Sequence, residues 1–454
     1  MWEQLFQYFE NIDDFLWSYV GFPAILFVGL WLSFRSRFAQ FRCFPRICKM
    51  FVRLLFNKGV LVDESTTRGV HPLTAFFAGL GGSVGIGNVV AITTAVQIGG
   101  PGAVFWMWLA AIAGSLVKYG EVFLGIHHRV PNKEGCFTGG PMIFLRKALG
   151  TWAGVLFCVL MSLYGVEIFQ FTVVASSISS CTGFDKVPVA IGLIGLVILA
   201  ELGGVRRIGN ICTAVIPLFI VLYLGMGAYV LLSNLEQIPA MCTTILSCAF
   251  TPHAAVGSFA GTSVLVAISQ GVRRGCYSSD IGIGYASIIH SATRMKNPSH
   301  QGALVIFEVF IDTFIICTMS VFLVLLTGTW KQDLEPMHLV EAALANYFPY
   351  MQYFMPFFLF LLGYSTIITY FCAGVKTAQY AFPRYGRQLY YVYTVTILFI
   401  FSFVETGQAL IVMSVVQAAL LALNLVGICK LRKEIEYDFD FEEAPLSVET
   451  AQAG

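Results

Sequence analysis

Five glycines lie between Gly79 and Gly87, in the middle of an apolar segment that runs from about 72 to 98. Each interior glycine destabilises a helix by about 1 kcal/mol relative to alanine, so the pattern predicts a broken helix. Inside a bilayer, loose backbone groups are tolerated only where they line a cavity or meet a ligand. Freed amides can then hold an anionic group and freed carbonyls a cation, as in many secondary transporters. The segment therefore predicts a solute-binding site at mid-membrane depth.

Glu167 is a second residue that could do chemistry, because it lies within an apolar stretch from about 151 to 181. A charged group at bilayer depth costs about 2.5–3.5 kcal/mol on insertion scales, and intramembrane acids are functional candidates by default. Glu167 could hold an ammonium group, bind a cation or carry a proton. The alternative is a hydrogen-bonded structural acid, paired with Tyr164 or Gln170.

The elements that must position these groups follow from composition. The chain has 454 residues, of which 57% are hydrophobic and 12% are charged, and its mean hydropathy is +0.76. Soluble domains carry about 25% charged residues, so we expect an all-α polytopic membrane protein in a lipid bilayer. The basic residues form no aromatic-interleaved patch, so nucleic-acid binding is not expected. No sequence feature indicates an obligate protein partner.

A spanning helix needs about 20 apolar residues, and the sequence predicts about 11 transmembrane helices. They lie near 15–34, 72–98, 102–126, 151–181, 187–201, 208–232, 252–270, 302–328, 351–380, 388–404 and 407–429. Most of the 27 Lys and Arg residues fall in alternate loops, among them 35–71, 127–149 and the stretch with Arg273 and Arg274. The positive-inside rule then places the N-terminus outside and the C-terminus in the cytoplasm. We expect the protein to lie in the plasma membrane, which in a bacterium is the inner membrane.

A weaker glycine cluster, Gly257 to Ser263, begins the seventh segment. Without the first span the remaining ten divide as five plus five, and each half begins with a glycine cluster. Paired interruptions at corresponding positions indicate an inverted repeat with the binding site between them, although glycines can also simply allow close helix packing. The predicted parts are an N-terminal helix with a basic amphipathic segment (1–71), a first repeat (72–233), a second repeat (234–430) and an acidic, disordered cytoplasmic tail (431–454).

Several phrases resemble the alanine or glycine:cation symporter family. They occur in family order from about 70 to 430, and the run from Gly99 to Trp108 is the most specific of them. The others are Gly85-Ile-Gly-Asn88, Lys118-Tyr-Gly-Glu121, Gly139-Gly-Pro-Met142, Ala249-Phe-Thr-Pro252, Ser258-Phe-Ala-Gly261, Phe310-Ile-Asp-Thr313 and Ser365-Thr-Ile-Ile368. The resemblance implies a leucine-transporter-like fold, a 5+5 inverted repeat plus one extra N-terminal helix. It also implies sodium-driven symport of a small neutral amino acid such as alanine, glycine or serine, D-alanine included.

By analogy with this fold, the amides of Gly85, Ile86 and Gly87 would hold the substrate carboxylate. Gly257 and Phe259 would face the ammonium group and line the pocket, and the remaining candidates for the substrate site are Glu167, Gln170, Thr366 and Tyr370. The co-transported sodium ion would take carbonyls of Gly81 or Val84 and the hydroxyls of Ser365 and Thr366. From the residues alone, each hydroxyl could instead bond the carbonyl one turn back.

Departures from the family pattern leave the substrate open. Ile86 replaces a usual threonine, Glu167 a usual asparagine and Tyr370 a usual tryptophan, and a loop that is usually Ser-Asn-Glu-Ala-Gly is Ser278-Ser-Asp-Ile-Gly282. The alternative function is therefore a proton-coupled or cationic amino-acid transporter of the same fold that uses Glu167. No enzyme is expected, since no HExxH, GxSxG or paired-acid motif lies at a membrane face.

The remaining buried ionisable groups are predicted to be structural. Lys118 and Glu121 are spaced to form a local i,i+3 pair. Asp312 follows Glu308 by one helical turn, and His290 has no evident partner pattern.

Overall fold

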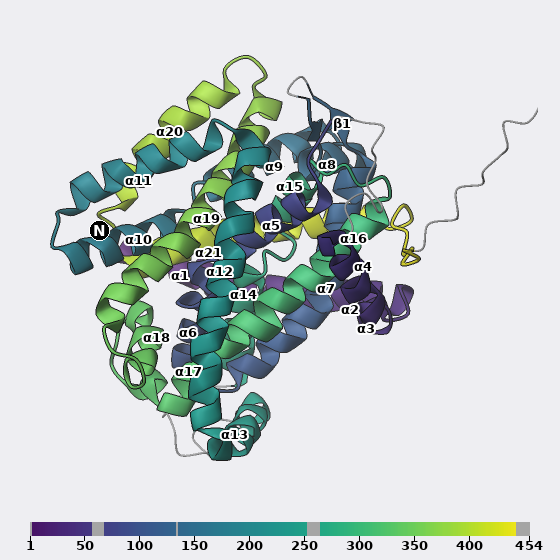
Figure 1. The fold of residues 1–454 in the computed structure, drawn as a ribbon. Helices are drawn as coiled ribbons and strands as arrows, with labels where there is room; N and C mark the ends of the chain where they lie inside the picture. Colours follow the sequence, from purple (N-terminus) through teal and green to yellow (C-terminus); the bar gives the residue numbers. More distant parts are fainter. Residues whose placement is uncertain (1, 57–67, 133–134, 252–263, 442–454) are drawn as a thin grey trace, which may run out of the picture.

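The computed structural model describes residues 2–56, 68–132, 135–251 and 264–441, and these are almost wholly helical (Figure 1). The only sheet in these ranges is a small hairpin of β1 (Val130–Pro131) and β2 (Phe137–Thr138). The α-helices are α1 (Trp2–Phe15), α2 (Phe22–Arg35), α3 (Ala39–Arg42), α4 (Phe44–Phe56), α5 (Pro72–Ser83), α6 (Ala91–Gly99), α7 (Ala103–His127), α8 (Pro141–Leu149), α9 (Thr151–Tyr164), α10 (Ile168–Thr182), α11 (Lys186–Glu201), α12 (Gly204–Ser233), α13 (Ile238–Phe250), α14 (Val264–Ser278), α15 (Tyr285–His290), α16 (Pro298–Val309), α17 (Thr318–Thr327), α18 (Pro336–Ala345), α19 (Met351–Ala381), α20 (Gly386–Phe401) and α21 (Thr406–Lys430).

Seven helical stretches of the described chain are long and apolar enough to cross a membrane. They are Phe6–Arg35, Ala103–His127, Thr151–Thr182, Gly204–Ser233, Pro298–Thr327, Met351–Ala381 and Thr406–Lys430. The pair α5 and the helical segment Ile86–Gly99 makes an eighth candidate, bent by 54°. Two further predicted segments, 187–201 and 388–404, match α11 and α20, which have 16 residues each. The remaining predicted segment, 252–270, overlaps the start of α14. The chain is therefore a multi-pass membrane protein.

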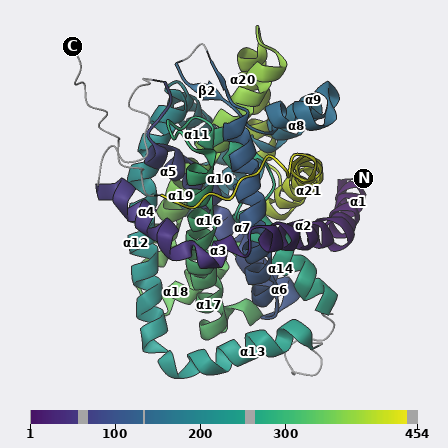
Figure 2. The ribbon, with the colours of Figure 1, turned by 90° about the vertical axis from the view of Figure 1, so that its right-hand side faces the viewer.

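Two long helices form the interior of this bundle. The most apolar window of α7 is 89% buried and that of α19 is 83% buried, whereas the corresponding window of α12 is only 28% buried. Helix α7 packs against α14 and α16, and α19 packs against α10 and α9. Helix α12 runs down the front of the molecule in Figure 1 and along its left edge in Figure 2, so it lies at the outside of the bundle. Its many exposed apolar residues suit a lipid-facing helix.

The connecting helices gather at opposite ends of the molecule. Helices α13 and α18 lie at one end, and α8 with the β-hairpin lies toward the other (Figure 2). Helix α4 carries its apolar residues on one face, buries Ile47, Met50 and Leu54, and packs against α16 and α5. The basic segment thus forms an amphipathic helix, as its alternation of basic and apolar residues indicates.

The disorder predicted for the acidic residues from 434 onward is wrong for 434–441, while 442–454 lie outside the described residues. Glu434 accepts hydrogen bonds from Lys147 at 3.0 Å and contacts the His128 ring at 2.8 Å. Phe439 and Phe441 are buried, and the ring of Phe439 lies 5.5 Å from that of Tyr119. These aromatic residues, which alternate with the acids, supply the apolar contacts that order the segment.

Candidate functional site

The first break lies between α5 and α6, at Val84 to Val90. Helix α5 continues through Gly79, Gly81 and Gly82 to Ser83, and the chain becomes extended at Val84 and Gly85. A short 3₁₀ turn, Ile86–Asn88, follows before α6 begins. The predicted break is therefore present, but it occupies the C-terminal part of the glycine cluster. The earlier glycines serve close packing, since a Cβ at Gly82 would lie 2.1 Å from the Tyr285 hydroxyl.

Two of the three amides in this break already have partners. The Gly85 amide donates to Asn88 Oδ1 at 2.9 Å, and the Ile86 amide donates to Gln170 Oε1 at 2.9 Å. The Gly87 amide has no hydrogen-bond partner within the described residues, and Gly87 lines the central cavity. Of the predicted carboxylate donors, Gly87 is thus the one left available, and Gln170 holds the break in place.

A second break lies between α14 and α15, a place that the sequence analysis did not single out. Gly257 and Phe259 lie outside the described residues. Helix α14 ends at Ser278, and Asp280, Gly282 and Gly284 all adopt left-handed backbone conformations before α15 begins. Left-handed conformations favour glycine, so the two glycines in the stretch that follows Ser278 were the signal that could have located this break.

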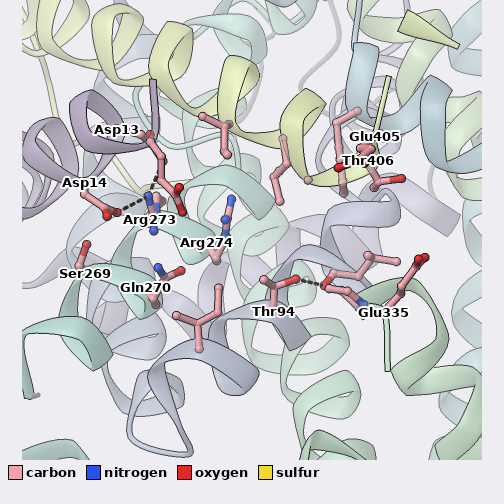
Figure 3. Close-up of a pocket in the computed structure, with 18 of the residues that line it drawn as sticks. Asp13, Asp14, Thr94, Ser269, Gln270, Arg273, Arg274, Glu335, Glu405 and Thr406 are labelled. Atoms are coloured by element: carbon pink, nitrogen blue, oxygen red, sulfur yellow. Dashed lines mark hydrogen bonds and ion pairs between the residues drawn. The ribbon is translucent and has the colours of Figure 1, made fainter. Parts of the chain in front are cut away.

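Arg273 and Arg274 are consequently not in a cytoplasmic loop, which corrects the loop prediction. Both are buried in α14, and Arg273 forms ion pairs with Asp13 and, at 3.0 Å, with Asp14 of α1 (Figure 3). A buried charge needs a partner, and the acids of the N-terminal helix provide it.

A third interruption separates α9 from α10 at Gly165 to Glu167. Glu167 has a φ of 51°, in the left-handed region. Its backbone amide donates to the Tyr164 carbonyl, and its side chain is only 1% exposed. A left-handed glutamate is uncommon and costs of order 1–3 kcal/mol. Apart from the acid itself, no residue pattern predicted this interruption.

The three interruptions surround one small central cavity of about 10 Å³, close to the volume that one water molecule needs. It is lined by Gly82, Ser83, Gly87, Tyr164, Glu167, Gln170, Tyr277, Ser278, Asp280, Thr366 and Tyr370. The structure therefore brings together five predicted substrate-site residues, namely Gly87, Glu167, Gln170, Thr366 and Tyr370. Gly85 and Ile86 lie just beside it. Tyr277 and Asp280 were missed as site residues, because the second break was expected elsewhere.

The predicted sodium ligands lie where α5 meets α19. The Thr366 hydroxyl donates to the Gly81 carbonyl at 3.1 Å, as well as to the Leu362 carbonyl one turn back. The Ser365 hydroxyl donates only to Leu362, at 2.8 Å. Val84, the other predicted carbonyl ligand, lies three residues after Gly81, and its amide donates to the Leu80 carbonyl. The fold thus brings the Thr366 hydroxyl and the Gly81 carbonyl together, although they are 285 residues apart in the sequence.

An ion network beneath the cavity replaces the predicted local pair of Lys118 with Glu121. Lys118 Nζ lies 2.7 Å from Glu308 Oε1 and also donates to Ser83 Oγ and the Ser279 carbonyl. Glu308 also contacts His290 at 3.1 Å. Glu121 accepts from the Gly284 amide and the Asn424 side chain instead. Lys118 therefore connects the first break to the second, a tertiary contact that i,i+3 spacing could not reveal.

Asp312 has partners from both breaks. It accepts hydrogen bonds from Asn88 on one side and from Ser278 and Ser279 on the other. Its oxygens are thereby satisfied, in agreement with a structural role.

A far larger pocket, of about 1080 Å³, lies beside the cavity and is lined by residues of α1, α14, α18 and α21, among others (Figure 3). Asp13, Arg273, Arg274, Glu335 and Glu405 are among its lining residues. Phe169 lines this wide pocket and Tyr277 lines the cavity. Their rings pack edge to face with centroids 5.9 Å apart, so this aromatic pair is part of the wall between the two spaces.

A small cavity where three interrupted helices meet, in an all-helical membrane protein, is the arrangement expected of a broken-helix transporter. A solved structure with a similar fold is MhsT in complex with L-phenylalanine, with a TM-score of 0.57 at 16% identity, covering 79% of this chain and 88% of that chain. At that identity the likeness concerns the fold, which is of the leucine-transporter kind.

The chain belongs to the sodium:alanine symporter family, whose model matches residues 2–443. An uncharacterized transporter of Bacillus subtilis (strain 168), YflA, is 35% identical over 87% of this chain and 85% of its own length. The sodium/alanine symporter AgcS of Methanococcus maripaludis is 29% identical over 93% of this chain and 94% of its own length. The family is one of transporters and not an enzyme class.

Proposed function

We propose that the protein is a secondary active transporter that couples sodium entry to uptake of a small neutral amino acid, with alanine, glycine, serine and D-alanine as the first substrates to test. One observation carries this proposal: the breaks at Val84 and Ser279 meet around a single small cavity. Freed backbone groups at such breaks are the usual means of holding a zwitterion and its ion in broken-helix transporters. The sodium/alanine activity in the name of AgcS supports the same assignment.

The substrate carboxylate would bind the Gly87 amide, at the positive end of α6. The ammonium group would lie toward Glu167 and the side chains of α14. Tyr164, Tyr277 and Tyr370 line the small cavity, and the bulk of their rings favours a short substrate side chain. The sodium ion would take the Gly81 carbonyl and the Thr366 hydroxyl, with Val84 and Ser365 beside them.

Alternating access follows from this placement. We assign α5 to α12 and α14 to α21 to two inverted repeats of five spans each, with α1 and α2 as the extra helix. The N-terminus then lies outside the cell and the C-terminus in the cytoplasm, so the wide pocket opens outward. Separation of Phe169 from Tyr277 would connect this pocket with the cavity, and rocking of one bundle would open the opposite side.

Proton coupling, or a cationic substrate, is the second candidate function. Its support is the placement of Glu167 on the cavity wall. Uptake into proteoliposomes, measured with and without sodium and at several pH values, separates the two candidates. A range from about pH 5.5 to 8.5 covers the titration of histidines and of acids with raised pKa values. Sodium-independent uptake that follows a pH gradient would favour the second.

We expect a thermal-shift screen of the purified protein to identify the substrate. A ligand at 100 times its dissociation constant stabilises its binder by about 2.7 kcal/mol, so a true substrate should raise the melting temperature in sodium and less so in potassium. Both L- and D-amino acids belong in the screen. If no neutral amino acid shifts the melting temperature in sodium, the proposed function is wrong.

We expect Thr366→Val to weaken the sodium response of that shift by about tenfold. The substitution keeps the shape of the side chain but removes one hydroxyl ligand, and a hydrogen bond to a charged group contributes about 1.5–3 kcal/mol. Thr377→Val is the matched control, because Thr377 is buried in the same helix but its hydroxyl meets the Gly374 carbonyl and the Ser162 hydroxyl and no group of the first break. Equal sodium responses in the two variants would remove Thr366 from the ion site.

A further inference from the structure

The C-terminal end of α7 brings two histidine rings to one place, away from the central cavity. Helix α7 ends at His127, and the chain leaves the helix at His128, with a φ of −101° and a ψ of 6°. The two rings lie edge to face with their centroids 4.8 Å apart. The His127 ring also stacks on the ring of Phe123 at 5.7 Å. The end of α7 therefore presents two imidazoles side by side.

The carboxylate of Glu434, from the C-terminal segment, completes a group of three possible metal ligands. Glu434 Oε2 lies 2.8 Å from His128 Nε2 and 3.9 Å from His127 Nε2, and the three ligand atoms lie within 4.8 Å of one another. A tetrahedral zinc ion, with its ligands at about 2.0–2.2 Å, holds them about 3.3–3.6 Å apart. Side-chain rotations are thus enough to close these three groups on one ion.

The residues that follow Glu434 hold it against α7. Ile435 is buried, and a Cβ at Gly120 of α7 would lie 3.2 Å from its Cδ1. The Tyr119 hydroxyl donates to the Glu436 carbonyl. The Glu434 backbone is therefore in place before any ion binds, which reduces the conformational entropy that a bound ion must remove.

An ordinary ion pair is the alternative explanation of this cluster. Lys147 Nζ lies 3.0 Å from Glu434 Oε1 and 3.1 Å from Glu434 Oε2. Lys147 is exposed and Glu434 partly so, and such pairs contribute little, so a metal ion can displace the ammonium group. His127 Nε2, at 3.9 Å, is too far from Glu434 for a hydrogen bond. A metal ion, unlike the ion pair, would use all three side chains.

The chemistry of the three ligands indicates the kind of ion. Imidazole nitrogen suits zinc, copper and nickel, whereas magnesium and calcium prefer oxygen ligands alone. Two histidines and a carboxylate, with the fourth position left to water, are a known zinc ligand set. The ordinary histidine pKa is about 6.5, so neutral rings that can bind a metal prevail at pH 7.5. No other group of three His, Cys, Asp or Glu side chains converges in this way in the described part of the chain.

We propose that His127, His128 and Glu434 form a binding site for one divalent transition-metal ion, with zinc as the ion to test. The ion joins the end of α7 to the C-terminal segment, whose ligands are 306 residues apart in the sequence. It thereby reinforces a contact on the helix whose Lys118 connects the two breaks. The site shares no residue with the central cavity, and it does not depend on the proposed function.

Equilibrium dialysis of the purified full-length protein, without a histidine tag, against zinc at pH 7.5 with excess magnesium tests this proposal. We expect one zinc ion per wild-type molecule. His127→Ala, His128→Ala and Glu434→Gln should each weaken binding at least about tenfold, because groups that only orient metal ligands already contribute about 10–100-fold. His338→Ala is the matched control, since its ring contacts Glu341 at 2.9 Å without a third ligand, and it should bind as the wild type does.

Lys147→Met distinguishes a metal site from an ion pair. It removes the ammonium group that competes for Glu434, so zinc should bind more tightly, by up to about fivefold, the size of an exposed ion pair. A wild type that binds no zinc overturns the site, as does zinc binding that His128→Ala and Glu434→Gln leave unchanged. Weaker binding in Lys147→Met also counts against it. Elution profiles and melting temperatures in chelator check folding, and the gain expected of Lys147→Met does not depend on a variant that loses function.

Discussion

Gly85→Ala should reduce the apparent sodium affinity of uptake by about tenfold to a hundredfold. A Cβ at this position would lie 2.4 Å from Thr366 Oγ1 and 3.1 Å from the Gln170 side chain. The added methyl group must therefore push apart the break and α19, where the sodium site is proposed. Overpacking of this kind costs about 1–3 kcal/mol, and each 1.4 kcal/mol is a tenfold change in affinity. Uptake of labelled substrate into proteoliposomes at graded sodium concentrations measures the effect.

Gly195→Ala is the matched control for this substitution. Gly195 lies within α11, and a Cβ there would meet nothing within 4 Å. Replacing it should leave the sodium dependence unchanged and stabilise the helix by up to about 1 kcal/mol. Should Gly85→Ala retain the wild-type sodium affinity, the proposed role of the first break would be wrong.

Lys118→Met should be the most destabilising of the substitutions considered, by about 3–5 kcal/mol, because it leaves the Glu308 carboxylate buried without its ion pair. Both side chains are fully buried and their charged atoms lie 2.7 Å apart. Lys118 also holds Ser83 and the Ser279 carbonyl, so both breaks lose an anchor. The melting temperature in detergent measures the loss.

A double variant tests whether the cause is the unpaired charge. Replacing Glu308 by Gln in the Lys118→Met background removes the buried carboxylate and should recover part of the lost stability. Lys186→Met, which changes an exposed lysine, should have little effect. A double variant that is less stable than Lys118→Met would show that packing, not charge, explains the loss.

The first break and the second illustrate how far sequence patterns reach in this protein. Five glycines within one apolar segment predicted the first break, because helix propensity is local and the penalty is repeated. The break at Ser278 to Gly284 was not predicted, because the cluster from Gly257 to Ser263, which lies outside the described residues, is richer in small residues and drew the prediction there. What interrupts α14 is the left-handed backbone at Asp280, Gly282 and Gly284.

Ion pairing was less predictable still. Sequence spacing suggested that Lys118 pairs with Glu121, and alternation of basic loops suggested that Arg273 lies in the cytoplasm. In the structure their partners are Glu308 and Asp13, which are 190 and 260 residues away. A buried charge takes whichever opposite charge the packed helices bring to it, and local spacing carries no record of that choice.

Hydropathy and glycine content by themselves determined that this protein is a helical membrane transporter with a break near Gly85, because burial of apolar segments and helix propensity act within a stretch of chain. Only the tertiary structure decided that Glu167, Asp280 and Tyr277 share one cavity. Their meeting depends on how α10 and α14 pack around α5 and α19, and on backbone conformations that packing, not local preference, maintains.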